Sequence, residues 1–289
     1  CDLAAQRVRK YGYEQGQPDR VDIITFAGAF HGRSAAAIAA AGSEKMTKGF
    51  GPLLPGFVHL DWADHDALRA AIGDTTAAIL IEPVQGEGGI RPLPDQCLKG
   101  LRDLCDEHGI LLVLDEVQCG VGRTGKLFAH EWAGIEPDIM MVAKGIGGGF
   151  PLGAVLAREN AASGMTAGTH GSTYGGNPLG CAVGRAVLEI VADPDFLADV
   201  SRKAGFLRQR LEGLVAAHPD VFDSVRGVGL MMGLKCRKAN TDVVAAAYDQ
   251  NLLTVPAADN VVRLLPALNI SDQDLAEAVD RLDRAAATL

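Results

Sequence analysis

The sequence lacks several features that mark whole classes of protein. Its 289 residues contain no uninterrupted apolar stretch long enough to span a bilayer, and the N-terminal residues CDLAAQRVRK have no hydrophobic signal core. The six cysteines show no C-x-x-C spacing and no accompanying histidine cluster, so they predict reduced thiols in a cytoplasmic protein and no metal site. No fixed-period repeat is visible.

An excess of positive charge is also missing. The chain has 27 Lys and Arg against 36 Asp and Glu, a formal net charge of -9. This balance argues against a nucleic acid or an anionic membrane as the main partner. Hydrophobic content of 48% and charged content of 22% fit a globular protein with a sizeable core. The length allows one large domain and a smaller one.

Two apolar runs in the middle of the chain each stop at a charged residue. Ile110–Leu114 stops at Asp115, and Ile139–Ala143 stops at Lys144. Such runs are typical of strands that are covered on both faces. Ligands bind outside the carboxyl ends of the strands in open α/β sheets, so we expect the acid and the amine at a binding edge.

A carboxylate beside a lysine suggests a specific chemistry. An aldehyde cofactor with a pyridine ring needs an amine to form a Schiff base and an anion to keep the ring nitrogen protonated. Lys144 and Asp115 are candidates for these roles. The alternative is a surface salt bridge at the bases of two loops.

A further strand end carries an aromatic ring and two basic side chains. The expected strand Val21–Phe26 leads into AGAFHGRS, which contains Phe30, His31 and Arg33. Phe30 would stack on a flat ring, and Arg33 would hold a carboxylate through parallel hydrogen bonds. The alternatives are a core aromatic for Phe30 and a hydrogen-bonded structural imidazole for His31.

A fourth strand, Ala77–Ile81, ends at Glu82 in EPVQGEGG. Glu82 is either a functional acid or a plain loop carboxylate. The glycines in this segment are too irregular for a dinucleotide fingerprint, so we do not expect NAD binding.

Glycine-rich segments occur at two other places. Gly120–Lys126, GVGRTGK, fits G-x-x-x-x-G-K, but Leu127 stands where a nucleotide hydrolase needs Ser or Thr, and the acidic strand comes before the loop. In HGSTYGGNP, Ser172 and Thr173 are candidates to bind a phosphate or a carboxylate, with a plain turn as the alternative.

Helices and strands alternate through the first two thirds of the chain. The amphipathic pattern of Pro94–His108 predicts one of these helices. The alternation predicts an α/β fold, a mostly parallel sheet with helices on both faces, in residues 1–192.

Residues 193–289 predict a small α+β domain. Gly227–Leu234 is expected as one strand, and Ser271 as the N-cap of the last helix. Arg263 interrupts the apolar strand VVRLLP, so its charge needs a partner, either a buried acid or a bound carboxylate.

Together these segments resemble class III pyridoxal-phosphate aminotransferases of fold type I, and within that family the enzymes that act on acylated ornithine. The matching segments are TFAGAFHGRS, ILIEPVQGEGG, LLVLDEVQCGVGRTGK, PDIMMVAKGIGGGFPLGA, HGSTYGGNP and VVRLLPALNI. They cover almost the whole chain in the order of the family.

The resemblance implies roles for individual residues. Lys144 would form the Schiff base with pyridoxal 5'-phosphate, and Asp115 would pair with its pyridinium nitrogen. Phe30 would stack on the cofactor ring, and Glu116 would lie beside it. Val117 and Gln118 would pack against the ring and bind its phenolic oxygen. Thr173 would bind the phosphate of the cofactor in the neighbouring subunit of a homodimer. The implied substrate contacts are Arg33 and Ser172, Arg263 on a carboxylate, and Glu82 as the acid that neutralises an arginine.

The resemblance also implies a reaction in arginine biosynthesis. The δ-amino group of N-acetylornithine would pass to 2-oxoglutarate, giving N-acetylglutamate 5-semialdehyde and glutamate. Alternatives are class III enzymes for succinyldiaminopimelate, succinylornithine, ornithine or 4-aminobutyrate, or a chain without catalytic activity. Family members have a longer N-terminal region with a phosphate-binding Ser-Gly-Ala segment, so we expect a chain beginning at Cys1 to bind the cofactor more weakly.

Overall fold

The computed structural model describes residues 1–289, which divide into two compact units. The first unit consists of Cys1–Pro83, Leu93–Gln118 and His130–Glu189. The second consists of Val84–Pro92, Cys119–Ala129 and Ile190–Leu289. The second unit thus takes in two segments that the predicted division into residues 1–192 and 193–289 had placed in the large domain.

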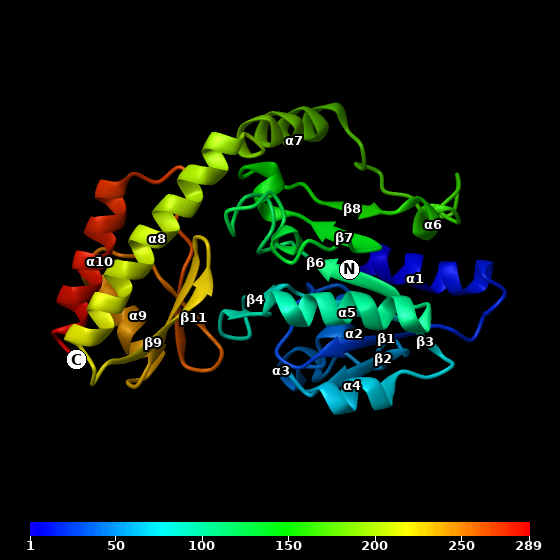
Figure 1. Ribbon diagram of the computed structural model, residues 1–289, viewed down its shortest axis with the longest axis horizontal. Helices are drawn as coiled ribbons and strands as arrows, with labels where there is room; N and C mark the ends of the chain where they lie inside the picture. The colour runs from blue at the N-terminus through cyan, green and yellow to red at the C-terminus, as the bar shows by residue number, and fades with distance from the viewer. The chain divides into compact units, whose positions relative to one another are not determined.

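A six-stranded sheet, in the order β2-β1-β3-β6-β7-β8, forms the centre of the first unit (Figure 1). Its strands are β1 (Asp22–Phe26), β2 (Phe57–Leu60), β3 (Thr76–Ile81), β6 (Leu111–Asp115), β7 (Ile139–Val142) and β8 (Ala154–Ala157). Every neighbouring pair is parallel except β7 and β8. The mostly parallel sheet expected from the sequence is confirmed.

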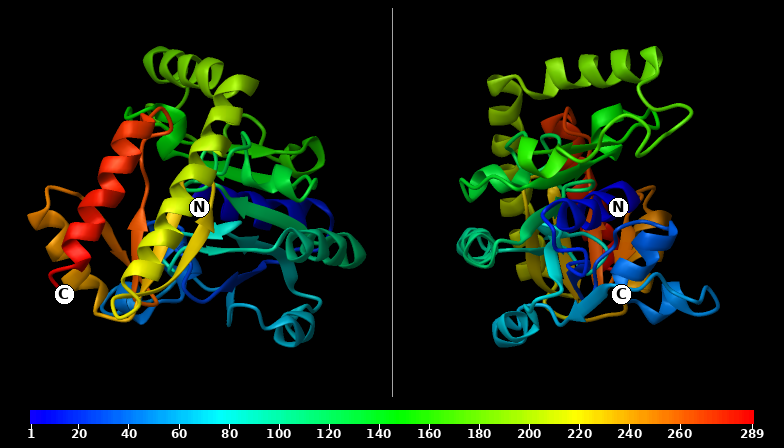
Figure 2. Two further views of the ribbon diagram at one scale, coloured as in Figure 1. Left: turned by 60° about the vertical axis from the view of Figure 1, so that its left-hand side comes forward. Right: turned by 90° about the vertical axis from the view of Figure 1, so that its right-hand side faces the viewer.

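Helices cover both faces of this sheet because its buried strands send alternate apolar side chains into two cores. Leu80 and Val113 belong to a core with α1 (Asp2–Glu14), α2 (Ala35–Ala41) and α6 (Glu159–Ala162). Ile79 and Leu112 belong to the other core, with α4 (His65–Ala71) and α5 (Asp95–His108). The right-hand view of Figure 2 shows α1 and α2 on one side of the strands and α4 and α5 on the other.

Four further helices complete the first unit. They are α3 (Glu44–Thr47), the 3-10 helices η1 (Ala129–Trp132) and η2 (Lys144–Gly147), and α7 (Pro178–Val191). The first residue of η1 and the last two residues of α7 belong to the second unit.

An antiparallel four-stranded sheet, in the order β11-β12-β10-β9, forms the second unit with three helices. The elements are α8 (Pro194–Ala217), β9 (Phe222–Val228), β10 (Met231–Cys236), α9 (Asn240–Asp249), β11 (Val255–Ala257), β12 (Val261–Leu264) and α10 (Asp272–Ala286). The helices share a core with Met232, Leu234 and Val262. Met231 and Val261 instead join a core with Val84 and Ile90 of the segment that contains the short strands β4 (Val84–Gln85) and β5 (Arg91–Pro92).

Two boundary predictions have different outcomes. Ser271 is the N-cap of α10, as expected, because its Oγ accepts the backbone N–H of Asp274 at 3.0 Å. The single strand expected over Gly227–Leu234 is wrong, because β9 and β10 form a hairpin there. Gly229, at φ 58°, has the left-handed backbone that lets the chain reverse.

No helix in the structure combines the length and the apolar character needed to cross a membrane. All six cysteines are free thiols. The structure contains no group of three or more His, Cys, Asp or Glu side chains arranged to hold a metal ion.

Candidate active site

The carboxyl ends of four adjacent parallel strands lie at one edge of the large sheet. β1, β3, β6 and β7 are consecutive neighbours in the sheet, so their carboxyl ends face the same way. The chemically active side chains expected from the sequence follow these ends. The candidate active site is therefore this edge of the first unit.

Asp115, the last residue of β6, is only 4% exposed and is held from two sides. Its Oδ2 lies 2.8 Å from His31 Nδ1, and its Oδ1 accepts the backbone N–H of Val117 at 3.0 Å. These contacts fix the plane of the carboxylate at the binding edge.

His31 follows β1, and its side chain is completely buried. Burial opposes protonation of the imidazole, but the hydrogen bond to Asp115, the charge of Asp115 and the charge of Glu82 together raise the pKa of His31 above its ordinary value. His31 Nε2 has no hydrogen-bond partner. The hydrogen-bonded imidazole is thus present, and its partner is the acid singled out from the sequence.

Glu82 comes directly after β3 and is 3% exposed. Its Oε1 accepts the backbone N–H of Phe30 at 2.8 Å, which ties the segment after β1 to the end of β3. The Phe30 ring is half-buried, and the guanidinium carbon of the exposed Arg33 lies 5.6 Å from its centroid. Phe30, Arg33 and Glu82 are therefore brought together at this edge.

Lys144 lies two residues beyond the end of β7, and its exposed side chain forms no hydrogen bond or ion pair within the chain. Met141 of β7 is paired with Asp115 of β6, so the two chain segments run side by side into the site. Lys144 has φ 48°, a left-handed conformation that is uncommon outside glycine and often occurs at functional sites. Lys144 thus lies at the carboxyl edge of the sheet, and its backbone has an unfavourable left-handed conformation.

Glu116 is 0% exposed, and its carboxylate has a partner inside the protein. Its Oε1 accepts the backbone N–H of His130 at 2.9 Å and lies 2.7 Å from His130 Nδ1. These bonds join the two ends of the segment between Val117 and Ala129. Sequence reasoning placed Glu116 beside the cofactor and missed this pair, while Val117 and Gln118 are half-buried beyond the end of β6.

Ser172 and Thr173 lie on the exposed segment before α7, and neither hydroxyl forms a hydrogen bond within the chain. No hydrogen bond or ion pair joins them to Asp115 or Lys144. Their expected contacts with a phosphate or a substrate remain predictions.

Arg263 belongs to the second unit, where it lies in β12 opposite Gly233 and Val255. It is 9% exposed, and its Nη1 donates to Glu87 Oε1 at 2.6 Å. The expected ion pair of this buried arginine is present. The acid paired with Arg263 is Glu87, and the arginine-neutralising role that the resemblance implies for Glu82, in the same EPVQGEGG segment, stays a prediction.

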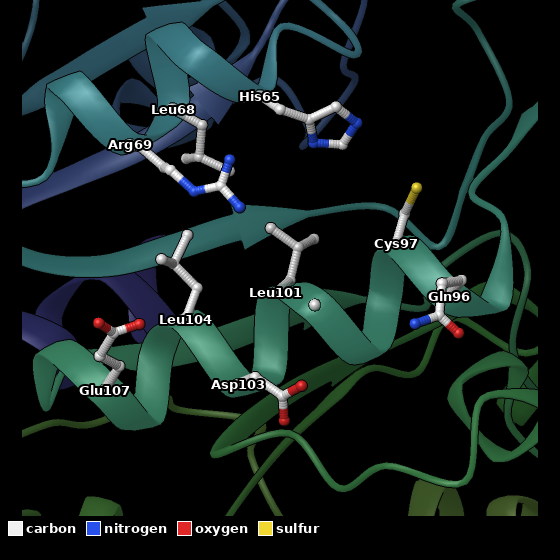
Figure 3. A pocket seen from close by; sticks show the side chains of 10 residues that line it. His65, Leu68, Arg69, Gln96, Cys97, Leu101, Asp103, Leu104 and Glu107 are labelled. Atoms are coloured by element: carbon white, nitrogen blue, oxygen red, sulfur yellow. The ribbon is translucent and has the colours of Figure 1, made fainter.

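A groove of about 430 Å³ lies between α4 and α5, away from the residues described above. Figure 3 shows Arg69 and Leu68 of α4 facing Leu101 and Leu104 of α5. His65, Arg69, Asp103 and Glu107 are exposed and form no hydrogen bond or ion pair. The groove shares no residue with the candidate active site.

The edge of the first unit fits a cofactor with a cationic ring and an aldehyde. It offers a buried carboxylate held by two donors, an unpaired primary amine and a half-buried aromatic ring. A carboxylate is an acceptor and can take the N–H of a protonated ring nitrogen in a charge-assisted hydrogen bond. The edge thus offers an amine, an anion and an aromatic ring, which suit the aldehyde and the ring of pyridoxal phosphate.

Comparison with known proteins agrees with this chemistry. The model of the aminotransferase class-III family matches residues 2–286. The acetylornithine aminotransferase of Rhodobacter capsulatus is 74% identical over 289 residues, which are 100% of this chain and 74% of that protein.

Two solved structures have the same fold. The N-acetylornithine aminotransferase from Stenotrophomonas maltophilia aligns with a TM-score of 0.84 and 40% identity, over 99% of this chain and 71% of that one. The ornithine aminotransferase from Toxoplasma gondii aligns with a TM-score of 0.94 and 31% identity, over 99% and 70%. The chain thus spans somewhat under three quarters of the length of these proteins.

Proposed function

The chain belongs to the class III aminotransferases, and we propose that it transfers the δ-amino group of N-acetylornithine to 2-oxoglutarate. The products would be N-acetylglutamate 5-semialdehyde and glutamate, in arginine biosynthesis. The 74% identity to a protein named for acetylornithine, along the whole chain, carries this proposal.

Membership of this family makes the chain a transaminase that depends on pyridoxal 5'-phosphate. The bound cofactor supplies an aldehyde for the amine and a ring that withdraws electrons from the reacting carbon. Asp115 is the residue to hold the ring N–H, since His31 and Val117 already fix its carboxylate. Phe30 is the residue to stack on the ring, with Val117 and Gln118 on its other sides.

Lys144 would have two tasks. Its unpaired amine would hold the cofactor through the aldehyde in the absence of substrate. The released Nζ then acts as a base that takes the proton from the carbon bearing the transferred amino group, and later as an acid that returns a proton. The left-handed backbone at Lys144 and the glycines that follow it hold the amine at the edge of the sheet.

Arg263 is the residue we assign to a substrate carboxylate, and its pairing with Glu87 supports a selective site. Guanidinium groups bind carboxylates through well-oriented, charge-assisted hydrogen bonds. Glu87 offsets the charge of Arg263 at 2.6 Å, so an incoming carboxylate competes with Glu87. Arg33 and Ser172 are proposed as further substrate contacts.

We also propose a homodimer in the cytoplasm. Thr173 is assigned to the cofactor phosphate of the partner subunit, and Tyr174 and Leu179 beside it expose large apolar surfaces that another chain would cover. The free cysteines are compatible with a reducing compartment.

The substrate assignment is tested by comparing amino donors on the same preparation. The kcat/KM values for N-acetylornithine, N-succinylornithine, succinyldiaminopimelate, ornithine and 4-aminobutyrate would be measured with 2-oxoglutarate as acceptor. We expect the highest value for N-acetylornithine. A higher value for any other donor would assign the chain to that substrate instead.

A further inference from the structure

The glycine-rich loop Gly120–Lys126 fits a nucleotide-binding pattern in sequence, but its structure serves another purpose. The 3-10 helix η1 follows it, where a phosphate-binding loop would open an α-helix. The loop instead folds back on itself, since the N–H of Gly122 bonds to the carbonyl of Leu127 at 3.0 Å. Its arginine, Arg123, points to other parts of the second unit.

Arg123 binds backbone carbonyls and no carboxylate. Its Nη1 donates to the carbonyl oxygens of Leu230 at 3.0 Å and Pro266 at 2.6 Å. Its own carbonyl accepts the N–H of Leu230 at 2.9 Å. Burial lowers the pKa of Arg123 to about 10, so its guanidinium still carries a positive charge at neutral pH. Arg123 therefore joins Leu230 and Pro266 through one charged group.

Both carbonyls lie at the same end of a strand pair. Leu230 directly precedes β10, and Pro266 lies two residues beyond the end of β12. The two strands are antiparallel, with Met232 opposite Leu264 and the next pair formed by Gly233 and Arg263. The guanidinium of Arg123 thus bridges β10 and β12 at the end of this strand pair, near the position of Arg263.

The contact leaves little room for adjustment. A Cβ at Gly229 would lie 2.3 Å from the carbonyl oxygen of Arg123 and 2.4 Å from Thr124 Cα, so the hairpin turn and the loop pack backbone to backbone. Within β10, a Cβ at Gly233, which is paired with Arg263, would lie 2.7 Å from Val261 Cγ1 of β12 and 3.0 Å from Ile90 Cγ1. Loss of the hydrogen bonds from Arg123 to Leu230 and Pro266 would therefore allow β12, the strand that carries Arg263, to shift.

We propose that Arg123 is a positioning residue for Arg263 and so controls how tightly the protein binds dicarboxylates. The inference rests on the proposed role of Arg263 as the carboxylate-binding residue. Arg123 acts through the backbone at Leu230 and Pro266 and touches no substrate.

The test compares glutarate binding by variants of the full chain loaded with pyridoxal 5'-phosphate. Calorimetry gives the Kd for glutarate, a dicarboxylate that cannot react, for the wild type, Arg123→Met, Arg123→Lys and Arg263→Met. Arg281→Met is the matched control, since Arg281 also donates to a carbonyl, that of Asn251 beyond α9. The Kd for the cofactor and the urea unfolding midpoint are measured on each variant.

We expect Arg123→Met to weaken glutarate binding about tenfold, as loss of one charged hydrogen-bond anchor of roughly 1.4 kcal/mol predicts. Cofactor binding should be unchanged. Arg123→Lys keeps the charge on a shorter side chain without the planar guanidinium, so we expect a smaller weakening of about threefold. Arg281→Met should bind glutarate like the wild type.

Three different results would overturn the inference. If Arg263→Met weakens glutarate binding while both Arg123 variants bind it like the wild type, Arg123 does not position Arg263, and the role of Arg263 stands. If Arg263→Met itself binds glutarate normally, the proposed role of Arg263 fails, and the inference fails with it. A loss of cofactor affinity equal to the loss of glutarate affinity would show general damage and would also contradict the inference.

Discussion

His31 Nδ1 lies 2.8 Å from Asp115 Oδ2, and both side chains are buried at the carboxyl edge of the large sheet. His31 follows β1 and Asp115 is the last residue of β6, and these two strands are separated in the sheet by β3. Glu82, at the end of that middle strand, adds a second negative charge near the imidazole. Two acidic residues therefore raise the pKa of His31 at this edge.

The first prediction concerns stability against pH. The pKa of His31 is raised in the folded protein, so its contribution to stability is complete below its ordinary pKa of 6.5 and is lost as pH rises toward the elevated value. Urea unfolding between pH 5.5 and 9 should show this decline in the wild type. His31→Phe should lack it. His65→Phe, which changes an exposed histidine of α4, should keep the decline, and an unchanged decline in His31→Phe would contradict the assignment.

Asp115→Asn tests the anion itself. The amide keeps the shape and loses the charge, so it no longer favours a protonated ring nitrogen. We expect kcat to fall by about a thousandfold, which corresponds to roughly 4 kcal/mol of activation free energy. Asp103→Asn, an exposed acid of α5, is the control and should turn over normally. Near-normal turnover by Asp115→Asn would remove Asp115 from the mechanism.

Lys144→Arg keeps a positive charge but cannot form an imine with the cofactor. We expect no turnover and no covalent label after borohydride reduction in the presence of pyridoxal 5'-phosphate, because only the free amine reacts. Peptide mass spectrometry of the wild type should place the label on Lys144, and the exposed control Lys45→Arg should still be labelled. A label on another lysine would identify that residue as the cofactor amine.

The residues at the binding edge of the large sheet were predictable because a charged residue marks the end of each strand in the sequence. Apolar runs stop abruptly at Glu82, Asp115 and Lys144, and parallel strands bring such positions to one edge whatever the details of packing. The partner of Asp115 was not predictable in the same way. His31 reaches Asp115 across 84 residues of sequence, and only the strand order brings them together.

The sequence also could not show which of two nearby acids pairs with Arg263. Glu82 and Glu87 lie in one short segment, but Glu82 belongs to the first unit and Glu87 to the second. The strand expected over Gly227–Leu234 is wrong for a local reason, because Gly229 turns the chain inside the apolar run VGLMMGL. The pair formed by Glu116 and His130 forms where the loop between them closes, and no periodic pattern in the sequence predicts that closure.

That pair gives a stability prediction. His130→Phe fills a similar space but removes the imidazole partner of Glu116, a carboxylate with no exposure to solvent. Leaving a buried charged group short of a partner should lower the free energy of unfolding by about 2 kcal/mol. His108→Phe, at an exposed position of α5, should cost much less. The loss should also shrink when Glu116→Gln is added, because no charge then remains to be satisfied, and equal losses in the two backgrounds would refute the coupling.

The last prediction separates Glu87 from Glu82. Glu87→Gln removes the anion that pairs with Arg263 at 2.6 Å, so glutarate should bind about threefold to fivefold more tightly, the size expected for a partly exposed ion pair. Glu82→Gln should leave glutarate binding unchanged, since Glu82 Oε1 binds the backbone of Phe30. It should instead lower the pKa of His31 by removing a nearby negative charge, which histidine NMR titration would detect. Tighter glutarate binding by Glu82→Gln, with no effect of Glu87→Gln, would support the role that the resemblance implies for Glu82 and contradict the one proposed for Glu87.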